Sequence, residues 1–400
     1  MKITCVIGTR PEVIKMAPVV LRLRRGEGNE VRVLATGQHR GLLDQALADF
    51  RIVADDDLDL MRPHQTLADL TARTVVALSG HLERHRPDLV LAQGDTTTVF
   101  CTALACYYHR VPFGHVEAGL RTGNPYFPFP EEKNRVLAGH LAELHFAPTL
   151  EASRNLRKEG IAAEDIHITG NTVIDALLTT AGQDVPLPIV PATPRYLLVT
   201  AHRRENFGKP LEEICRALRD LVEHDPDLSI VYPVHPNPRV LETVTAELQD
   251  RDRAHLIEPV NYPQFVALMK HSYAILSDSG GVQEEGPALG KPVLVLRDET
   301  ERPEAVAAGT VRLVGPHHDA IVAATRALCD RPEVYAQFAR ATNPYGDGHA
   351  ADRIAAILAQ RYKADFGRPD GPIPPWPPDE RRDVSSSPPV TSSEHGVTEP

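Results

Sequence analysis

The sequence predicts an α/β protein built from two doubly wound parallel sheets that face a central cleft. Three observations support this fold. Short apolar runs alternate with turns and helix-length amphipathic stretches, the 400 residues are enough for two hydrophobic cores, and a proline-rich stretch divides the chain near its middle. Open parallel sheets bind their ligands at the carboxyl ends of the strands, so we expect the functional residues there.

The first half of the chain supplies the first predicted sheet. The runs KITCVIG, EVRVLATG and DLVLAQG are each followed by a helix-length stretch, which is typical of β-α-β units. Further strands are predicted in PFGHVEAG, ELHFAPT and DIHITGN. We assign residues 1–170 to an N-terminal domain that carries the candidate catalytic carboxylates.

The second half repeats the pattern after the stretch PLPIVPATP at 186–194, whose prolines indicate a link between domains. A second domain is predicted over residues 171–350, with strands in YLLVTAH, LSIVYPVH, AHLIEPV, YAILSDSGG and KPVLVLR. A helix over 351–364 is expected to pack back on the first domain. The proline- and serine-rich end, 368–400, is expected to be disordered.

Charge and cysteine usage exclude several classes of function. The net charge is −11, and no basic block is present that would follow a phosphate backbone, so nucleic acid is not an expected partner. Five scattered cysteines lack any C-x-x-C spacing and fit a reducing cytoplasm better than a disulfide framework or a zinc site. No run of about 18 apolar residues occurs, so no membrane span is expected.

Candidate anion-binding residues follow the first predicted strand. In GTRPEVIK a turn opens a helix, so backbone amides together with Arg10 and Lys15 can meet a phosphate. The motif G-x-G-x-x-G does not occur here, which argues against a tightly bound nicotinamide or flavin cofactor. A surface turn with a solvated arginine is the alternative interpretation.

A second candidate anion site lies in the second half, in SDSGGVQEEGPALGKP. Ser279, Gly280 and Gly281 lead from a strand into a helix, where small residues allow a phosphate to approach the helix amides. Glu284 and Glu285 can accept hydrogen bonds from ribose hydroxyls. The alternative is an ordinary helix start with a solvated acidic face. His202 in TAHRREN, His235 in VYPVHPNP and Arg302 in ERPEAV occupy comparable loops.

Carboxylates dominate the opposite side of the predicted cleft. Asp95 follows one strand, Glu117 ends the next, and Glu131 starts a helix. Neighbouring parallel strands lie about 4.8 Å apart, so these carboxylates can share one pocket. Helix capping is the alternative role for Asp95 and Glu131. Three carboxylates facing several cations across a nucleotide-sized crevice favour catalysis.

Ten motifs in order over residues 1 to about 362 resemble the non-hydrolysing UDP-N-acetylglucosamine 2-epimerases. They are GTRPE, GDTTT, HVEAGLRTG, PEEKNR, ITGNTVIDAL, HRREN, YPVHPNP, SDSGG-x-QEE, GKPVLVLRD-x-TERPEA and NPYGDG. The resemblance implies a glycosyltransferase-B-like pair of Rossmann-like domains and a homodimer. It also implies interconversion of UDP-N-acetylglucosamine and UDP-N-acetylmannosamine without a metal, a nicotinamide or any other cofactor.

The same resemblance assigns residue roles. Catalysis is implied for Asp95, Glu117, Glu131 and His202, and contacts to the UDP-sugar for Arg10, Lys15, Phe265, Ser279, Gly280, Gly281, Glu285 and Arg302. Bacterial members use the loop after the second strand to bind a second, activating UDP-N-acetylglucosamine, which makes Gln38 and His39 possible allosteric residues. Here Gly41 follows the arginine, where a longer polar side chain is frequent, and His64 stands where some members have a basic contact.

The chemistry of the sugar explains why both charge types are needed. The hydrogen at C2 has no adjacent carbonyl and becomes acidic only when the bond from C1 to UDP breaks, as in glycoside cleavage. Cations then stabilise the departing diphosphate, and carboxylates move protons on the two faces of C2. A glycosyltransferase, a hydrolysing 2-epimerase and a non-catalytic nucleotide-sugar sensor are the alternatives.

Overall fold

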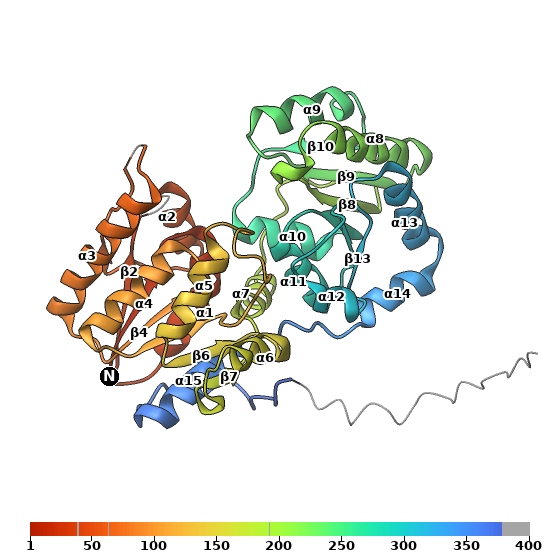
Figure 1. The fold of residues 1–400 in the computed structure, drawn as a ribbon. Coiled ribbons are helices and arrows are strands. Elements are labelled where there is room, and N and C mark those ends of the chain that lie inside the picture. Colours follow the sequence, from red (N-terminus) through yellow and green to blue (C-terminus); the bar gives the residue numbers. More distant parts are fainter. Residues whose placement is uncertain (38–39, 63, 192, 378–400) are drawn as a thin grey trace, which may run out of the picture.

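The computed structural model describes residues 1–37, 40–62, 64–191 and 193–377. Its backbone forms two parallel sheets, each covered by helices on both faces, which confirms the predicted fold class (Figure 1). We call the part around the first sheet the N-terminal lobe and the part around the second sheet the C-terminal lobe. No helix in these described ranges is long and apolar enough to cross a membrane.

The N-terminal lobe contains a seven-stranded sheet in the order β3-β2-β1-β4-β5-β6-β7. Its strands are β1 (Lys2–Ile7), β2 (Glu30–Ala35), β3 (Asp56–Asp57), β4 (Leu89–Gln93), β5 (Phe113–Val116), β6 (Leu144–Ala147) and β7 (Ile166–Ile168). Its helices are α1 (Arg10–Leu23), α2 (Arg40–Asp49), α3 (Leu67–His85), α4 (Thr97–His109), α5 (Glu131–Leu141) and α6 (Leu150–Lys158), with a 3₁₀ turn at Ala163–Asp165. Apolar side chains of α1 and α2 fill one face of the sheet, and those of α3, α4 and α5 fill the other.

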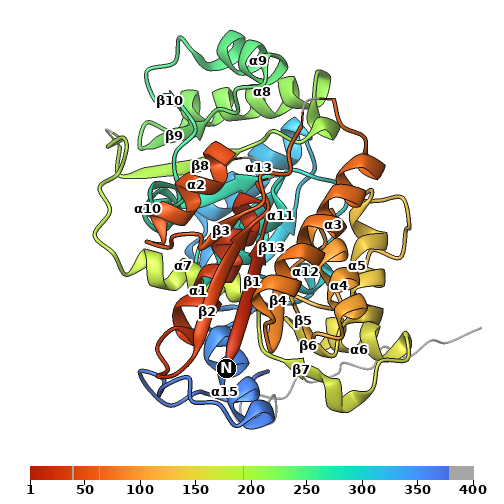
Figure 2. The ribbon, with the colours of Figure 1, turned by 90° about the vertical axis from the view of Figure 1, so that its left-hand side faces the viewer.

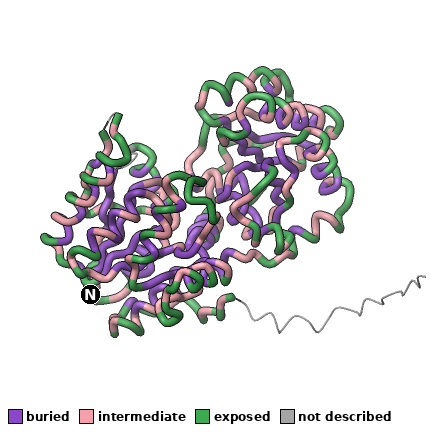
Figure 3. The backbone as a smooth tube through the Cα atoms, viewed as in Figure 1, coloured by how far each residue is buried: buried purple, intermediate pink, exposed green. Residues whose placement is uncertain are grey.

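The C-terminal lobe contains a six-stranded sheet in the order β10-β9-β8-β11-β12-β13. Its strands are β8 (Arg195–Thr200), β9 (Leu228–Pro233), β10 (Ala254–Ile257), β11 (Ala274–Ser277), β12 (Val293–Val295) and β13 (Val311–Leu313). Its helices are α7 (Thr172–Ala181), α8 (Lys209–His224), α9 (Pro238–Leu248), α10 (Tyr262–His271), α11 (Gly280–Ala288), α12 (Pro303–Ala307), α13 (His318–Asp330) and α14 (Pro332–Arg340), with a 3₁₀ turn at Arg204–Asn206. Buried residues follow the strands of both sheets (Figure 3).

The last helix, α15 (Ala350–Tyr362), returns to the N-terminal lobe and lies near the N-terminus in both views (Figures 1 and 2). Ile354 and Leu358 belong to the core around α1, because the apolar face of α15 packs there. The carboxylate of Asp175 in α7 accepts hydrogen bonds from the amides of Ala350 and Ala351, which caps the start of α15. The chain therefore crosses between the lobes twice.

Residues 368–377, whose composition predicts disorder, make specific contacts. The guanidinium of Arg353 lies 5.6 Å from the ring centre of Trp376 and donates a hydrogen bond of 2.8 Å to the carbonyl of Pro374. Trp376 donates in turn to the carbonyl of Pro148. The ring of Trp376 holds this segment against the protein through apolar and cation–π contacts. The proline-rich composition of the segment does not indicate these contacts. Residues 378–400 lie outside the described part of the chain.

The strand order places the functional loops. In each sheet the order reverses beside the first strand, so the loops after β1 and β4, and those after β8 and β11, emerge side by side at the carboxyl edge. Val6 pairs with Ala92, and Thr200 pairs with Ser277. This topological switch point is where open α/β sheets bind ligands. It brings Glu12, after β1, near Asp95, after β4, and it brings His202 near Asp278 in the other lobe.

Candidate active site

The loop after β1 has a shape that its sequence enforces. A Cβ atom at Gly8 would lie 2.5 Å from the hydroxyl oxygen of Thr36, so only glycine fits. Thr9 caps α1, and the carboxylate of Glu12 reaches back to the amides of Gly8 and Thr9. Arg10 therefore stands at the first position of α1, at the carboxyl edge of the sheet.

Glu117 is held by a buried ion pair. Its backbone φ of +62° is left-handed, and its carboxylate accepts hydrogen bonds of 2.6 and 2.8 Å from Lys15 and one of 2.6 Å from Gln93. Burial alone raises the pKa of Glu117, but the charge and hydrogen bond of Lys15 outweigh it and hold the pKa below its ordinary value. The carboxylate is therefore ionised, desolvated and oriented before any ligand arrives.

The other two predicted carboxylates differ in their surroundings. Asp95 forms an ion pair with Arg135 and keeps 30% of its side-chain surface exposed. Glu131 is the first residue of α5 and is half-buried. Its neighbour Glu132 is buried and accepts from the amides of Thr122 and Gly123, so Glu132 is the residue that braces the loop between β5 and α5.

On the C-terminal lobe, α11 presents its amides at the cleft. Ser279 is the N-cap residue, but its side chain makes no capping hydrogen bond. A Cβ atom at Gly280 would lie 2.7 Å from a carboxylate oxygen of Glu301, and Gly281 likewise adds no side chain. An anion can therefore approach the first turn of α11 closely, where the helix dipole favours negative charge.

His202 is positioned by Asp278, a residue that the sequence analysis did not single out. Asp278 is fully buried, and its carboxylate accepts 2.8 Å hydrogen bonds from the amides of His202 and Arg203. The imidazole of His202 stacks on that of His235, with 5.4 Å between ring centres. Burial, together with His235 and Arg203, lowers the pKa of His202 against the opposing effect of Asp278. An anion bound beside His202 would oppose this shift, because a negative charge favours the protonated imidazole.

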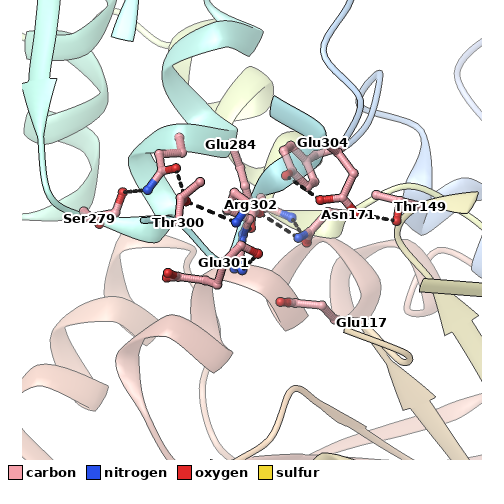
Figure 4. A network of polar contacts seen from close by, with 12 residues as sticks. Glu117, Thr149, Asn171, Ser279, Glu284, Thr300, Glu301, Arg302 and Glu304 are labelled. Carbon is pink, nitrogen blue, oxygen red and sulfur yellow. Dashed lines mark hydrogen bonds and ion pairs between the residues drawn. The ribbon is translucent and has the colours of Figure 1, made fainter. Parts of the chain in front are cut away.

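A polar network centred on Arg302 of the C-terminal lobe faces Glu117 of the N-terminal lobe, and Thr149 of the N-terminal lobe joins it through Glu304 (Figure 4). Arg302 forms an ion pair with the buried Glu284, which also accepts 2.8 Å from Asn171. The charges of Arg302 and Glu284 act on the pKa values of Glu117 and Lys15. Acidic and basic groups of the two lobes therefore share one low-dielectric region.

The remaining predicted contacts surround this centre. Glu285 accepts a 2.8 Å hydrogen bond from Tyr262, and burial raises its pKa to about 7. The charge of Arg10 acts on both groups, although Arg10 comes from the other lobe. Phe265 is partly buried against the core of the C-terminal lobe. Gln38 and His39 lie outside the described residues.

A cavity of about 610 Å³ opens beside the network and is lined by both lobes. Arg121, Thr122 and Phe127 line it from the N-terminal lobe, and Glu205, Arg297 and Thr300 are among the residues on the C-terminal side. The volume is in the range of small-molecule sites. Neither Arg121 nor Arg297 stood out in the sequence, because a lone arginine in a loop carries no distinctive spacing.

Fold and site together define a two-lobed α/β enzyme of glycosyltransferase-B-like architecture, with carboxylates on one lobe and a glycine-rich helix start on the other. A family model described as UDP-N-acetylglucosamine 2-epimerase matches residues 21–359. Over 369 residues, 90% of this chain and 98% of the relative, the sequence is 51% identical to the UDP-N-acetylglucosamine 2-epimerase of Yersinia pestis.

Comparison with solved structures points to the same family. A Listeria monocytogenes protein, 47% identical, superposes with a TM-score of 0.85 over 91% of this chain and 98% of that one. The UDP-GlcNAc 2-epimerase of Neisseria meningitidis, solved with UDP-GlcNAc bound, is 46% identical, with a TM-score of 0.82 over 90% of this chain and 100% of that one. The chain belongs to the UDP-N-acetylglucosamine 2-epimerase family.

The buried Glu12 predicts a pH-dependent stability. Burial raises its pKa to about 7, although hydrogen bonds from Thr96, Gly8 and Thr9 oppose the shift. Because the folded pKa lies above the unfolded one, the native state loses stability as the pH rises from about 4.5 to 7. We expect the Glu12→Gln variant to gain stability relative to the natural protein over this window, as measured by urea unfolding at several pH values.

The difference in stability between Glu12→Gln and the natural protein reports on the carboxyl group of Glu12 alone. Asp175 and Glu285, whose pKa values are also raised to about 7, are present in both proteins and cancel in the difference. A difference in the free energy of unfolding that stays constant from pH 4.5 to 7 would contradict the assignment to Glu12.

Proposed function

We propose that this protein interconverts UDP-N-acetylglucosamine and UDP-N-acetylmannosamine by eliminating UDP to a 2-acetamidoglucal and adding it back. Membership of the family supports the substrate, since a relative of 46% identity is solved with UDP-GlcNAc bound. The observation that carries the proposal is the Glu117–Lys15 pair facing Arg302 and Glu284 across the cleft. In that arrangement a carboxylate that can transfer protons, Glu117, lies close to the cations Lys15 and Arg302, which can stabilise a departing diphosphate.

Departure of UDP is the first step. The α11 amides at Ser279, Gly280 and Gly281 bind the diphosphate, with Arg10 and His202 as further donors. Glu285 and Tyr262 are placed to receive the nucleoside ribose, and Phe265 and His235 to contact the nucleoside or diphosphate at the rim. These donors are in place before the reaction and stabilise the negative charge that develops on UDP. Such preorganised electrostatic stabilisation is usually the largest single contribution to catalysis in an enzyme.

Proton transfer at C2 follows. Positive charge developing at C1 is stabilised by nearby carboxylates and makes the C2 hydrogen acidic. Glu117, Asp95 and Glu131 serve as base and acids on the two faces of C2. Lys15 keeps Glu117 ionised and ready to accept a proton. We also assign Lys15 to the diphosphate, because its positive charge attracts an anion. A different proton, from a second of these carboxyl groups, is then added to the opposite face of C2, and re-addition of UDP at C1 completes the inversion.

Elimination predicts exchange of the C2 hydrogen with solvent. We expect incubation of UDP-N-acetylglucosamine with the protein in deuterated water to give a mixture with UDP-N-acetylmannosamine in which the sugars carry deuterium at C2. Proton NMR measures this exchange over time. Turned-over sugar that retains its original hydrogen at C2 would refute the elimination route. Accumulation of free N-acetylmannosamine and UDP would instead identify a hydrolysing enzyme, because water would then have reached the glycal.

The carboxylates should matter for turnover more than for binding. We expect Glu117→Gln and Asp95→Asn to lower kcat by about 100-fold or more, the usual contribution of a general acid or base, with little change in UDP affinity by calorimetry. Glu151→Gln, on the exposed face of α6, is the matched control and should keep normal turnover. Normal turnover in Glu117→Gln or Asp95→Asn would remove that residue from the mechanism.

We further propose that the enzyme acts as a homodimer in the cytoplasm. All five cysteines are free, which suits a reducing compartment. The packed helices α3 and α4 expose Val76, Tyr107 and Tyr108 at 73%, 65% and 63%, and such apolar and aromatic side chains are typical of a subunit interface.

The dimer is tested by mass. We expect light scattering at micromolar concentration to give twice the chain mass of 43.9 kDa. Val76→Asp should weaken the dimer, because it places a charge in the apolar contact, whereas Val190→Asp, in the exposed link between lobes, should not. A single-chain mass for the unmodified protein would contradict the proposal.

A further inference from the structure

Two histidines and a carboxylate meet at the outer edge of the N-terminal lobe, away from the cleft. His81 and His85 lie one turn apart on α3 in the stretch HLERH, and Asp56 lies on the edge strand β3. The strands β2, β1 and β4 separate β3 from β5, after which Glu117 lies. The function described above does not use these three side chains.

Their ligand atoms are already gathered. The carboxylate oxygen Oδ2 of Asp56 lies 3.9 Å from Nδ1 of His81 and 3.7 Å from Nε2 of His85, and one ligand atom from each residue lies within 4.8 Å of the other two. A tetrahedral ion with metal–ligand distances of about 2.1 Å separates its ligands by roughly 3.4 Å. Small side-chain rotations therefore suffice for coordination.

The imidazole of His81 lacks a hydrogen-bond partner in the described structure. Its side chain is 1% exposed, and both ring nitrogens are buried without a hydrogen bond. A buried polar group without a partner is costly, and an uncharged imidazole is a ligand for a transition metal ion.

The surroundings allow an ion to enter. Asp56 and His85 keep 33% and 25% of their side-chain surfaces exposed, which leaves room for water as a fourth ligand. Arg32 competes, because its Nη1 lies 3.2 Å from the carboxylate of Asp56. Arg32 also pairs with Glu30 at 2.7 Å and is 33% exposed, so it can keep that partner while an ion takes its place at Asp56.

We propose that Asp56, His81 and His85 form a binding site for a divalent transition metal ion such as Zn²⁺, with water as the fourth ligand. Two imidazoles and one carboxylate are a ligand set that Zn²⁺ uses in proteins, and histidines at i and i+4 of a helix present their rings to one ion. The ion joins α3 to the edge strand β3. Its role is to stabilise this edge of the sheet, and the reaction in the cleft does not use it.

The test uses the full-length protein after removal of metal with EDTA. We expect Co²⁺ titration to give the visible absorption of a tetrahedral site at one ion per chain, and Zn²⁺ to raise the thermal unfolding midpoint. His85→Gln should weaken binding by at least about 100-fold, since it removes a direct ligand and even supporting groups contribute 10- to 100-fold. Asp56→Asn should weaken it as well.

His318→Gln is the matched control. His318 is a partly exposed histidine paired with Asp220 and Asp319 in the C-terminal lobe, so its loss removes an ordinary surface site and should leave Co²⁺ binding intact. The unfolding midpoint of His85→Gln in EDTA should match that of the natural protein, which shows that the variant folds. The proposal is overturned if the natural protein gives no tetrahedral spectrum, or if His85→Gln binds Co²⁺ as tightly as the natural protein does.

Discussion

The candidate active site depends on keeping opposite charges together in a region that is largely shielded from water. Lys15 and Glu117 come from the N-terminal lobe, and Arg302 and Glu284 come from the C-terminal lobe. Each charge would be costly to bury alone, because desolvation penalises the ionised form. Together they stabilise one another, and the carboxylate of Glu117 remains ionised although it is buried.

The backbone around these charges is organised to keep them in place. Glu117 adopts a left-handed conformation directly after β5, and Gln93 at the end of β4 donates to it. On the other lobe, Asp278 at the end of β11 holds the amides of the loop that carries His202. In both lobes, then, a residue at a strand end fixes the neighbouring loop. Side chains held in this way lose little entropy when a ligand binds.

Much of this arrangement was predictable because the signals were local. Apolar runs such as KITCVIG and YAILSDSGG became β1 and β11, and GTRPE and SDSGG lie at helix starts, since capping residues and glycine act within a few positions. The strands β3 and β13 were missed: Asp56–Asp57 is short and acidic, and Val311–Leu313 is only three residues long. These two segments are strands because they pair with a neighbouring strand of the sheet. Their own sequences are too short to show the apolar pattern of a strand.

The sequence by itself determined the alternation of strands and helices, the residue types that such chemistry requires and the resemblance that links them to the family. The tertiary structure alone decided which charges meet. Glu117 pairs with Lys15, 102 positions away, Glu132 braces the loop beside Glu131, and Trp376 anchors the segment after α15. These contacts follow from how the helices, strands and loops pack together. Contacts between distant segments depend on how the packed layers fit, and no local pattern encodes them.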